Sequence, residues 1–249
     1  MSDAKIIAAR KSKTIFTADG KVYKSFDDVY GMSDVLREAY NMANVQETGL
    51  KVPELLEVRP VDGKWTIIMN YVVGDTMAEL MEAHPEKMDE YLVRFVDIQL
   101  DLERRNVPRL ARIKEKMHRK IDQSGLDATT RYELHTRLDS MEEKTRLCHG
   151  DFNPSNIVIT PDDEAYVLDW SHATQGDPAE DAARTYLLFK LDGRDDLAEK
   201  YLKLYTVRGD VARQRVEKWL AIVAASQMVK GNESERELLK PWTEVVEYE

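Results

Sequence analysis

The sequence contains a single cysteine, Cys148, among its 249 residues. A lone thiol cannot form an internal disulfide, which fits a reducing compartment. Long hydrophobic runs are also missing, since no stretch approaches the roughly 20 apolar residues of a membrane-spanning helix. The segment MSDAKIIAARKSK lacks an apolar core of signal-peptide length. We therefore expect a cytoplasmic protein with no membrane association.

The sequence also lacks an excess of positive charge. Its 36 Lys and Arg residues stand against 46 Asp and Glu residues, giving a net charge of -10. Binding to a polyanion needs a basic surface that releases counterions, so the charge argues against a nucleic acid partner. A cationic small molecule is compatible with this balance, although acidic surfaces also serve solubility alone.

The composition is that of a folded globular protein. Apolar residues make up 43% of the chain and charged residues 33%, with no low-complexity tract and no repeat of solenoid period. The length suits one large domain or two modest ones with a real core.

Two Asp-Gly pairs divide the first part of the chain. The pair at 19–20 separates KTIFT from KVYKSF, and the pair at 62–63 lies inside VPELLEVRPVDGKWTIIMNYVV. Asp-Gly between apolar runs is a strong β-hairpin signal. Apolar residues at helical spacing over 33–43 predict a helix between the hairpins. The predicted order is β-β-α-β-β, ending near Val73.

The pattern becomes helical after Gly74. Apolar residues recur at helical spacing over 88–100 and over 211–228. One exception is NIVIT-PDDE-AYVL, whose turn residues and β-branched flanks predict a third hairpin. We expect a bilobal α+β fold, with a small β-rich lobe over 1–73 and a mainly helical lobe over 74–249.

The third hairpin has a chemical consequence. If it folds symmetrically about the Asp162-Asp163 pair, Asn156 faces Asp169 across the strands. Directly opposed residues lie about 4.5 to 5.5 Å apart. Amide and carboxylate oxygens are hard ligands of the kind that Mg²⁺ combines with phosphate oxygens and water. The spacing predicts a magnesium and phosphate site at the open end of the hairpin.

Asp151 lies five residues before Asn156, in the stretch CHGDFNPSN. Gly150 and Pro154 disfavour an ordinary helix or a central strand there, which predicts a loop. A carboxylate beside a metal-bound phosphate could accept the proton of an attacking hydroxyl. Phosphoryl transfer needs little more than positioning, charge neutralisation and an oriented nucleophile. Asp and Asn are common in turns, so the joint spacing carries this prediction.

The order His149, Asp151, Asn156, Asp169 also fits the catalytic loop and metal-binding Asp of protein kinases, with Gly150 in place of Arg. The stretches HGDFNPSNIVI, VLDW and GDPAEDAARTYLL resemble the aminoglycoside phosphotransferase and choline kinase family. This family is the small-molecule branch of the protein-kinase-like fold. The resemblance is densest over 146–190.

The resemblance assigns roles to residues of this loop and its surroundings. It implies Asp151 as the catalytic base, Asn156 and Asp169 as magnesium ligands, and ATP with Mg²⁺ as phosphate donor and cofactor. His149 would organise the loop rather than carry a proton. Asp181 would support the loop by accepting hydrogen bonds from its backbone N–H groups.

The resemblance extends to the first lobe. Lys24 matches the strand lysine that grips the α and β phosphates of the nucleotide, and Glu38 the helix glutamate that pairs with it. Adenine would bind the backbone of a hinge at Asn70, Tyr71 and Val72. By themselves, a lysine ending a strand and a glutamate on a helix are ordinary solvated residues.

The sequence departs from its relatives in two places. Residues 5–19 contain no glycine, so the glycine-rich loop of protein kinases is missing. A leucine-histidine pair frequent in the family is replaced by Ile98-Gln99. Acidic residues such as Asp177 and Glu180 could line a cleft for an aminated substrate, although charged runs are usually solvated faces.

The main hypothesis is an ATP- and magnesium-dependent kinase of a small-molecule hydroxyl. Its acceptor would be an aminoglycoside, amino-alcohol, choline-like alcohol or sugar, with a cationic acceptor compatible with the acidic charge. The alternatives are a nucleotide-binding regulatory protein without catalysis and a Ser/Thr protein kinase. The sequence specifies no oligomeric state.

Overall fold

The computed structural model describes residues 5–10, 12–230 and 233–244. The chain divides into two units. The first unit comprises Met1–His84 and Pro154–His172, and the second comprises Pro85–Asn153 and Ala173–Glu249. Residues 74–84 and 154–172, which we had placed in the helical lobe, therefore belong with the N-terminal sheet. The reason is a small second sheet that pairs strands from these two stretches.

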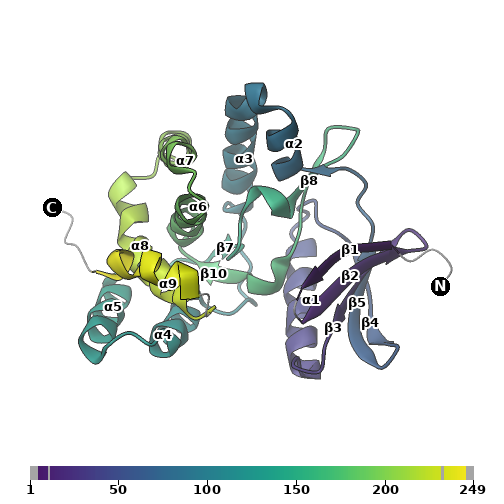
Figure 1. Ribbon diagram of the computed structural model, residues 1–249, viewed down its shortest axis with the longest axis horizontal. Coiled ribbons are helices and arrows are strands. Elements are labelled where there is room, and N and C mark those ends of the chain that lie inside the picture. Colours follow the sequence, from purple (N-terminus) through teal and green to yellow (C-terminus); the bar gives the residue numbers. More distant parts are fainter. Residues whose placement is uncertain (1–4, 11, 231–232, 245–249) are drawn as a thin grey trace. The chain divides into compact units, whose positions relative to one another are not determined.

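The first unit is built on a five-stranded antiparallel sheet of order β1-β2-β3-β5-β4 (Figure 1). The strands are β1 Lys5–Arg10, β2 Lys13–Ala18, β3 Lys21–Phe26, β4 Leu55–Val61 and β5 Lys64–Asn70. Both predicted Asp-Gly hairpins are present. Asp19 and Gly20 have φ of 50° and 70°, and Asp62 and Gly63 have φ of 49° and 81°. Positive φ at both central residues is the type I′ geometry that matches the twist of paired strands.

Strand β1 was missing from the predicted β-β-α-β-β order. It pairs only with β2, and its register shifts between Ile6 and Ala8. Its apolar side chains stay exposed, with Ile6 at 63% and Ile7 at 52%. An edge strand with exposed apolar residues has no inside-outside alternation to detect. The correct order in this part of the chain is β-β-β-α-β-β.

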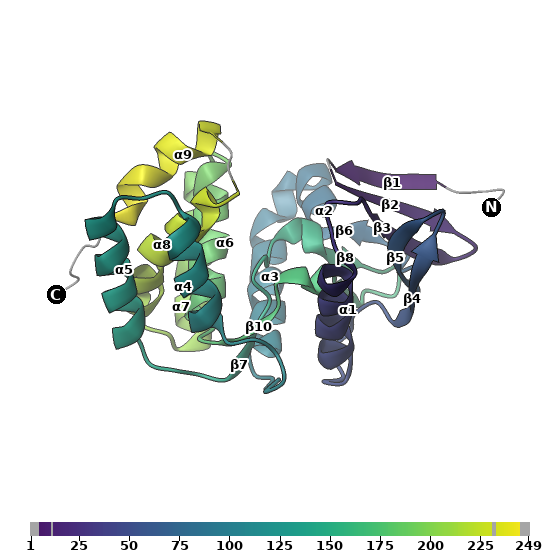
Figure 2. The ribbon, with the colours of Figure 1, turned by 90° about the horizontal axis from the view of Figure 1, so that it is seen from below.

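Helix α1 (Met32–Gln46) packs against the sheet, as the pattern over 33–43 predicts (Figures 1 and 2). Its apolar stripe of Val35, Ala39, Met42 and Val45 is buried. The contact is therefore the ordinary burial of an amphipathic helix on a sheet.

The rest of the first unit carries the third hairpin. Its elements are β6 Asp75–Thr76, α2 Met77–Ala83, the 3₁₀ turn η2 Pro154–Asn156, β8 Ile157–Ile159, β9 Ala165–Val167 and the 3₁₀ turn η3 Trp170–His172. The three strands form a sheet of order β6-β8-β9. Asp169 follows β9 with φ of 55°.

The register of this hairpin differs from the prediction by one residue. Ile157 pairs with Val167, and the Leu168 N–H donates to the Asn156 carbonyl oxygen at 2.8 Å. The loop has three residues, 161–163, because Asp163 adopts φ of 61°. Three-residue hairpin loops place a left-handed residue at that position. Asp169 thus lies one residue beyond the one that faces Asn156, at the same open end of the hairpin.

Besides glycine, one residue type adopts the left-handed backbone conformation in the described part of this fold. Within 5–10, 12–230 and 233–244, every non-glycine residue with positive φ is an aspartate. These residues are Asp19, Asp62, Asp163, Asp169 and Asp210. A short polar side chain that bonds locally lowers the cost of this conformation.

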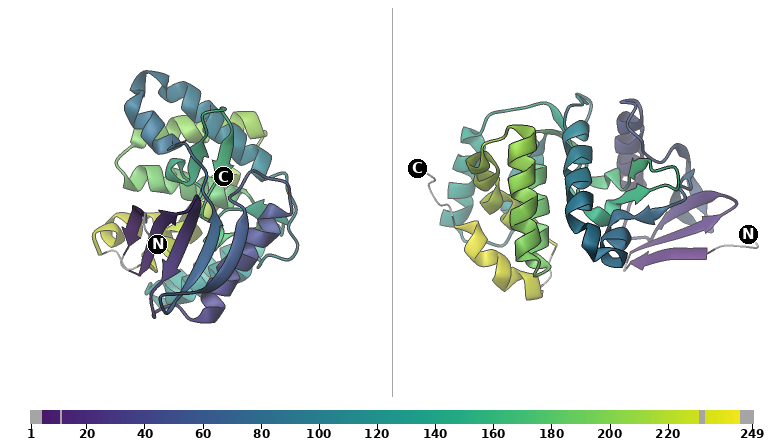
Figure 3. Two further views of the ribbon diagram at one scale, coloured as in Figure 1. Left: turned by 90° about the vertical axis from the view of Figure 1, so that its right-hand side faces the viewer. Right: turned by 90° about the horizontal axis from the view of Figure 1, so that it is seen from above.

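The second unit is mainly helical (Figures 2 and 3). Its helices are α3 Met88–Leu102, α4 Ile113–Gln123, α5 Ala128–Ser140, α6 Ala179–Leu191, α7 Asp195–Gly209, α8 Arg213–Met228 and α9 Glu233–Leu239. Strands β7 Arg146–Cys148 and β10 Thr174–Gly176 pair with each other, and η1 Pro85–Lys87 and η4 Lys240–Thr243 are 3₁₀ turns. The predicted helices over 88–100 and 211–228 are confirmed as α3 and α8.

The core of the second unit is formed around α8 and an aromatic cluster. Residues 219–228 of α8 are all buried. The Phe95 ring lies 4.6 Å from the Phe152 ring and 5.8 Å from the Tyr201 ring, centroid to centroid.

Within the described residues, no helix is both long enough and apolar enough to cross a membrane.

Gly74 offers a test of the small sheet. A Cβ atom there would lie 2.2 Å from the carbonyl oxygen of Ile159, because the two backbones meet where β6 joins β8. We expect Gly74→Ala to lower the free energy of unfolding by about 3 kcal/mol, measured by urea denaturation. Gly20→Ala is the matched control, because Gly20 has positive φ and open space around it. It should cost only about 1 kcal/mol; equal losses would contradict the clash.

Candidate active site

A buried ion-pair network links three elements of the first unit. The Nζ atom of Lys24 on β3 lies 2.5 Å from Glu38 Oε1 on α1 and 3.0 Å from Asp169 Oδ1. The second oxygen of Glu38 accepts from Lys13 Nζ at 3.1 Å. Lys24 is only 6% exposed. The lysine and glutamate thus form the pair that the resemblance implies.

The charge of Lys24 is maintained by its acidic neighbours. Burial would lower the pKa of its ammonium, but the charges of Asp169 and Glu38 outweigh that effect and raise the pKa above the ordinary lysine value. The ammonium group therefore stays protonated at neutral pH, despite its burial. A fixed cation of this kind suits an anionic ligand such as a phosphate.

Asn156 and Asp169 are the predicted metal ligands. Asn156 ends η2, and Asp169 follows β9, so both flank the open end of the hairpin. Their amide and carboxylate groups offer oxygen donors only, and one oxygen of Asp169 is already shared with Lys24. No group of three or more His, Cys, Asp or Glu residues forms a metal cage anywhere in the described chain. The donor set therefore fits Mg²⁺, which takes its remaining ligands from phosphates and water.

The predicted hinge follows β5. The Asn70 N–H donates to the Glu54 carbonyl at 3.1 Å, and the Tyr71 N–H donates to the Gly20 carbonyl at 3.2 Å. These two donors are used by the sheet itself. Of the three hinge residues, only Val72 keeps its N–H outside backbone hydrogen bonds within the described residues.

In the second unit, Asp181 on α6 supports the loop that carries Asp151. Its carboxylate accepts from the backbone N–H of His149 and from that of Gly150, the latter at 2.6 Å. Gly150 has φ of 77°, which lets two successive N–H groups point at one carboxylate. The fully buried His149 ring accepts at Nδ1 from the Asp151 N–H at 3.2 Å. The contacts of His149 and Asp181 are those of loop support.

The neighbouring acids Asp181 and Glu180 are both buried, but they differ in the charges and hydrogen-bond donors around them. Burial and the charge of Glu180 raise the pKa of Asp181 to about 6, against the opposing effects of His149 and the two backbone N–H groups. Burial likewise raises the pKa of Glu180, although Lys116 and Arg184 oppose it. Neither carboxylate oxygen of Glu180 accepts a hydrogen bond from the described residues. Asp181 therefore supports the loop through hydrogen bonds. No hydrogen bond from the described residues accounts for the burial of Glu180.

Asp151 is held by Arg184, a residue that the sequence reasoning missed. Arg184 Nη2 lies 3.0 Å and Nε 3.3 Å from Asp151 Oδ1. Burial would raise the pKa of Asp151, but the charges of Arg184 and Lys230 outweigh it and lower the pKa. Asp151 is therefore ionised at neutral pH. The sequence does contain a signal for Arg184. It follows Asp181 by three residues on α6, and residues at that spacing lie on the same face of a helix.

Several polar residues that drew attention in the sequence are internal supports. Asp177 is 5% exposed and accepts from Arg215 Nη2 at 2.6 Å and from Trp219 Nε1 at 3.3 Å. Gln99 is fully buried and accepts from the Tyr201 hydroxyl at 2.7 Å. Asp177 lines a pocket but is paired with Arg215, and Glu180 is buried, so an aminated substrate at these acids stays a prediction.

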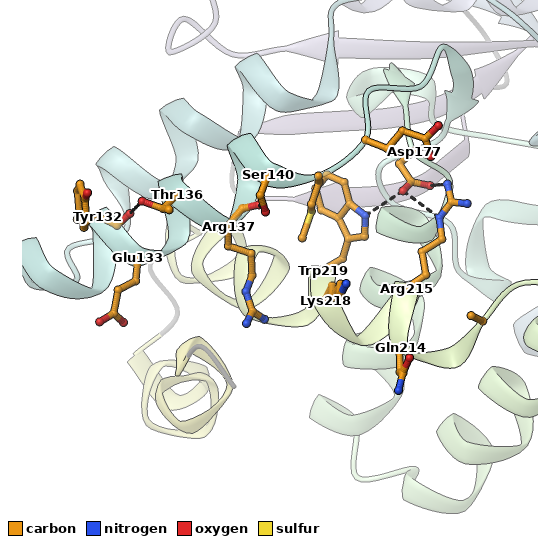
Figure 4. A pocket seen from close by; sticks show the side chains of 13 residues that line it. Tyr132, Glu133, Thr136, Arg137, Ser140, Asp177, Gln214, Arg215, Lys218 and Trp219 are labelled. Carbon is orange, nitrogen blue, oxygen red and sulfur yellow. Dashed lines mark hydrogen bonds and ion pairs between the residues drawn. The ribbon is translucent and has the colours of Figure 1, made fainter. Parts of the chain in front are cut away.

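A pocket of about 800 Å³ lies beside α5 and α8 (Figure 4). Its lining includes the Asp177, Arg215 and Trp219 cluster, in which the polar groups bond one another (Figure 4). None of the predicted site residues lines it. The Lys24 network and the Asp151 loop are therefore not part of this pocket.

The two buried acids provide a matched pair of variants. Asp181→Asn should lower the free energy of unfolding by about 2 kcal/mol, because an amide has one acceptor oxygen for two N–H donors. Glu180→Gln should be neutral or stabilising, since it removes a buried charge and breaks no hydrogen bond. Urea denaturation at pH 7 measures both. A larger loss for Glu180→Gln than for Asp181→Asn would contradict this account of the loop.

The chain is similar to several solved structures. Aminoglycoside phosphotransferase APH(4)-Ia matches with a TM-score of 0.73 at 16% identity, over 97% of this chain and 91% of that one. A choline/ethanolamine kinase family protein from Mesorhizobium loti matches with a TM-score of 0.68 at 17% identity, over 96% and 84%. A thermostable APH(4)-Ia mutant in ternary complex with AMP-PNP and hygromycin B matches with a TM-score of 0.72 at 17% identity, over 97% and 91%.

These structures establish the fold, and the predicted fold class is confirmed: an antiparallel sheet in one part and a helical second part, as in the protein-kinase-like phosphotransferases. No relative was found among curated protein sequences. Residues 22–219 match the family model described as the phosphotransferase enzyme family, APH. That range covers most of the chain and includes the Lys24 network, the Asp151 loop and helix α6. The chain belongs to the phosphotransferase enzyme family, as the residues around Asp151 predict.

Proposed function

We propose that this protein is an ATP- and Mg²⁺-dependent kinase that transfers the γ-phosphate to a hydroxyl of a small molecule. The observation that carries the proposal is the buried Lys24, held between Glu38 and Asp169. A buried lysine shared by two acids has little value for stability, because desolvation costs offset the ion pairs. It has a clear value where phosphates and a metal ion must be bound. The similar structure with AMP-PNP and hygromycin B supports a nucleotide and a small-molecule acceptor.

In this proposal the nucleotide is bound by the first unit. Lys24 would bind the α and β phosphates, and Asn156 and Asp169 would hold Mg²⁺. When bound, the metal ion would neutralise charge on the transferred group. The backbone N–H of Val72 is the hinge donor that remains for adenine.

Asp151 orients the acceptor and takes its proton. The acceptor oxygen forms a bond to the γ phosphorus, the bond from that phosphorus to the leaving ADP oxygen breaks, and the hydroxyl proton passes to the carboxylate. The lowered pKa of Asp151 makes it a weak base. This is compatible with phosphoryl transfer, whose loose transition state demands orientation of the nucleophile more than its early deprotonation.

A nucleotide-binding protein without catalysis is the second candidate. It is favoured by the pairing of Arg10 with Lys13, because β1 and β2 are too close in sequence at this point for a long phosphate-covering loop. The ionised Asp151 held by Arg184 speaks against it, because a binding protein has no use for an oriented carboxylate. Stabilisation by ATP and Mg²⁺, without acceptor-dependent ADP release, would favour this candidate.

Replacement of Asp151 separates the two candidates. We expect Asp151→Asn to lower kcat by about a thousandfold, because the variant loses the carboxylate that Arg184 orients toward the acceptor hydroxyl and has no group to take its proton. The measurement is ADP release over a panel of aminoglycosides, amino-alcohols, hydroxy acids, sugars and sugar phosphates. Asp196→Asn, an exposed acid at the start of α7, is the control and should retain full activity. An Asp151→Asn variant that is folded and fully active would exclude this mechanism.

Asp169 allows the metal site to be tested without disturbing the backbone. Asn tolerates left-handed φ, so Asp169→Asn keeps the local conformation and removes the carboxylate. We expect the Mg²⁺ concentration for half-maximal ADP release to rise by at least about tenfold. Asp163→Asn is the matched control, a left-handed and exposed aspartate on the same hairpin. An unchanged Mg²⁺ requirement in Asp169→Asn would remove this residue from the metal site.

A further inference from the structure

A second cavity of the second unit, here called the basic cavity, has a volume of about 270 Å³. Its lining comes from the C-terminal ends of α3 and α7, the start of β7, and the first turns of α6 and α8. The charged part of the lining comprises two acids, Glu103 and Asp177, and five cations. The cations are Arg104, Lys144, Arg146, Arg208 and Arg215. This local excess of positive charge contrasts with the net charge of -10 for the chain.

Three of the five cations have a carboxylate partner. Arg215 Nη2 lies 2.6 Å from Asp177 Oδ1, and Arg208 Nε lies 2.7 Å from Asp97 Oδ1. Both arginines bind their acid through Nε and Nη2, and Nη1 of each donates to no group among the described residues. Lys144 Nζ lies 3.5 Å from the carboxylate of an exposed glutamate. These three charges are therefore compensated within the protein.

The other two cations, Arg104 and Arg146, have no carboxylate partner within the described chain. The two residues lie side by side, because Arg146 Nη1 donates to the backbone carbonyl oxygen of Arg104 at 3.0 Å. The exposed guanidinium of Arg104 forms no hydrogen bond with the described residues. Guanidinium groups with unused N–H donors match the geometry of phosphate and carboxylate groups. The basic cavity thus presents two adjacent groups that are suited to bind an oxyanion.

The two acids of the lining do not neutralise this pair. Asp177 is already engaged by Arg215. Glu103 is 8% exposed and accepts from the Tyr205 hydroxyl at 2.9 Å. Burial and the charge of Asp181 raise the pKa of the Glu103 carboxyl well above its usual value. The negative charge that Glu103 contributes to the cavity at neutral pH is therefore reduced.

The acids beside the basic cavity are also paired. An adjoining cavity of about 490 Å³ shares Arg104 and Arg208 with it and includes Asp97 and Asp101. Asp97 forms its ion pair with Arg208, and Asp101 forms one with Arg105. Arg104 lines both cavities without a carboxylate of its own among the described residues. The balance of charge at the basic cavity is therefore positive.

We propose that the basic cavity is a binding site for a small molecule that carries a phosphate or carboxylate group. Arg104 and Arg146 bind the anionic group, and Leu100 and Val211 offer apolar contacts to the rest of the molecule. The volume lies near the lower end of the range for small-molecule sites, roughly 300 Å³, which favours a small molecule over a polymer. None of the residues proposed for phosphoryl transfer lines this cavity. The site is therefore additional to the proposed kinase function and does not depend on it.

The test is a titration of the whole protein with two probes, inorganic phosphate and malonate, followed by isothermal calorimetry at constant ionic strength. At least one probe should bind saturably, with a Kd of about 1 mM or below. The comparison of the two probes distinguishes a phosphate ligand from a carboxylate ligand. If neither probe binds saturably, the proposal is wrong.

Charge reversal assigns the binding to the basic cavity. Arg104→Glu and Arg146→Glu should each weaken binding of the preferred probe by at least about tenfold. Arg119→Glu is the matched control, because Arg119 is an exposed arginine on α4 that does not line the cavity. It should bind the probe as the wild type does. Lys24 offers another place for phosphate, so unchanged binding in both cavity variants would show that the anion binds elsewhere and would overturn the proposal.

A conservative variant separates loss of binding from loss of folding. Arg146→Gln removes the charge but keeps an N–H group that can donate to the Arg104 carbonyl oxygen. It should keep the Tm of the wild type without ligand and weaken probe binding by at least about threefold. If Arg146→Glu does not fold, Arg104→Glu and Arg146→Gln decide the question. The titration needs neither nucleotide nor acceptor, so its result stands whether or not the proposed kinase activity is found.

Discussion

A charged ammonium group can be buried only where acids compensate for its lost hydration, and the first unit is organised around this constraint at Lys24. The two compensating acids come from separate parts of the chain, Glu38 from α1 and Asp169 from the segment after β9. One lysine thereby ties a strand, a helix and the third hairpin of this unit together. The arrangement also places the proposed phosphate-binding cation and the proposed metal-binding acid in one network.

The second unit solves a related problem around a carboxylate. Asp181 is buried, and its two backbone N–H donors only partly offset the cost, since its pKa stays raised to about 6. Its neighbour Glu180 is buried with no hydrogen bond from the described residues. Such costs are usual where a fold holds a functional loop, because the groups that orient a site are seldom those that maximise stability. Asp181 supports the loop that carries Asp151.

Much of the architecture followed from local sequence signals. The Asp-Gly turns and the helical pattern over 33–43 were sufficient to predict two hairpins and α1, because these features depend on neighbours in the chain. The family assignment followed from the spacing of His149, Asp151 and Asn156. Roles in catalysis and metal binding remain proposals, since contacts alone do not reveal them.

The failures came from properties that local patterns do not encode. The predicted register of the third hairpin differs from that of the structure by one residue. The left-handed φ of Asp163 sets the loop length, and the local sequence pattern does not encode it. Burial of Asp177 and Glu180 was missed because a run of acids looks solvated in sequence, whichever way the helix packs. Arg184 was overlooked because its contact with Asp151 joins residues 33 positions apart.

The five left-handed aspartates differ in which other residue types can replace them. At Asp19, Asp62, Asp163 and Asp210 the fold asks mainly for a residue that accepts positive φ, so Asn or Gly can substitute with little loss. Asp169 must satisfy the same backbone demand and also supply the carboxylate that Lys24 contacts. Two independent requirements then restrict this position to a single residue type, while the other four stay open to neutral exchange.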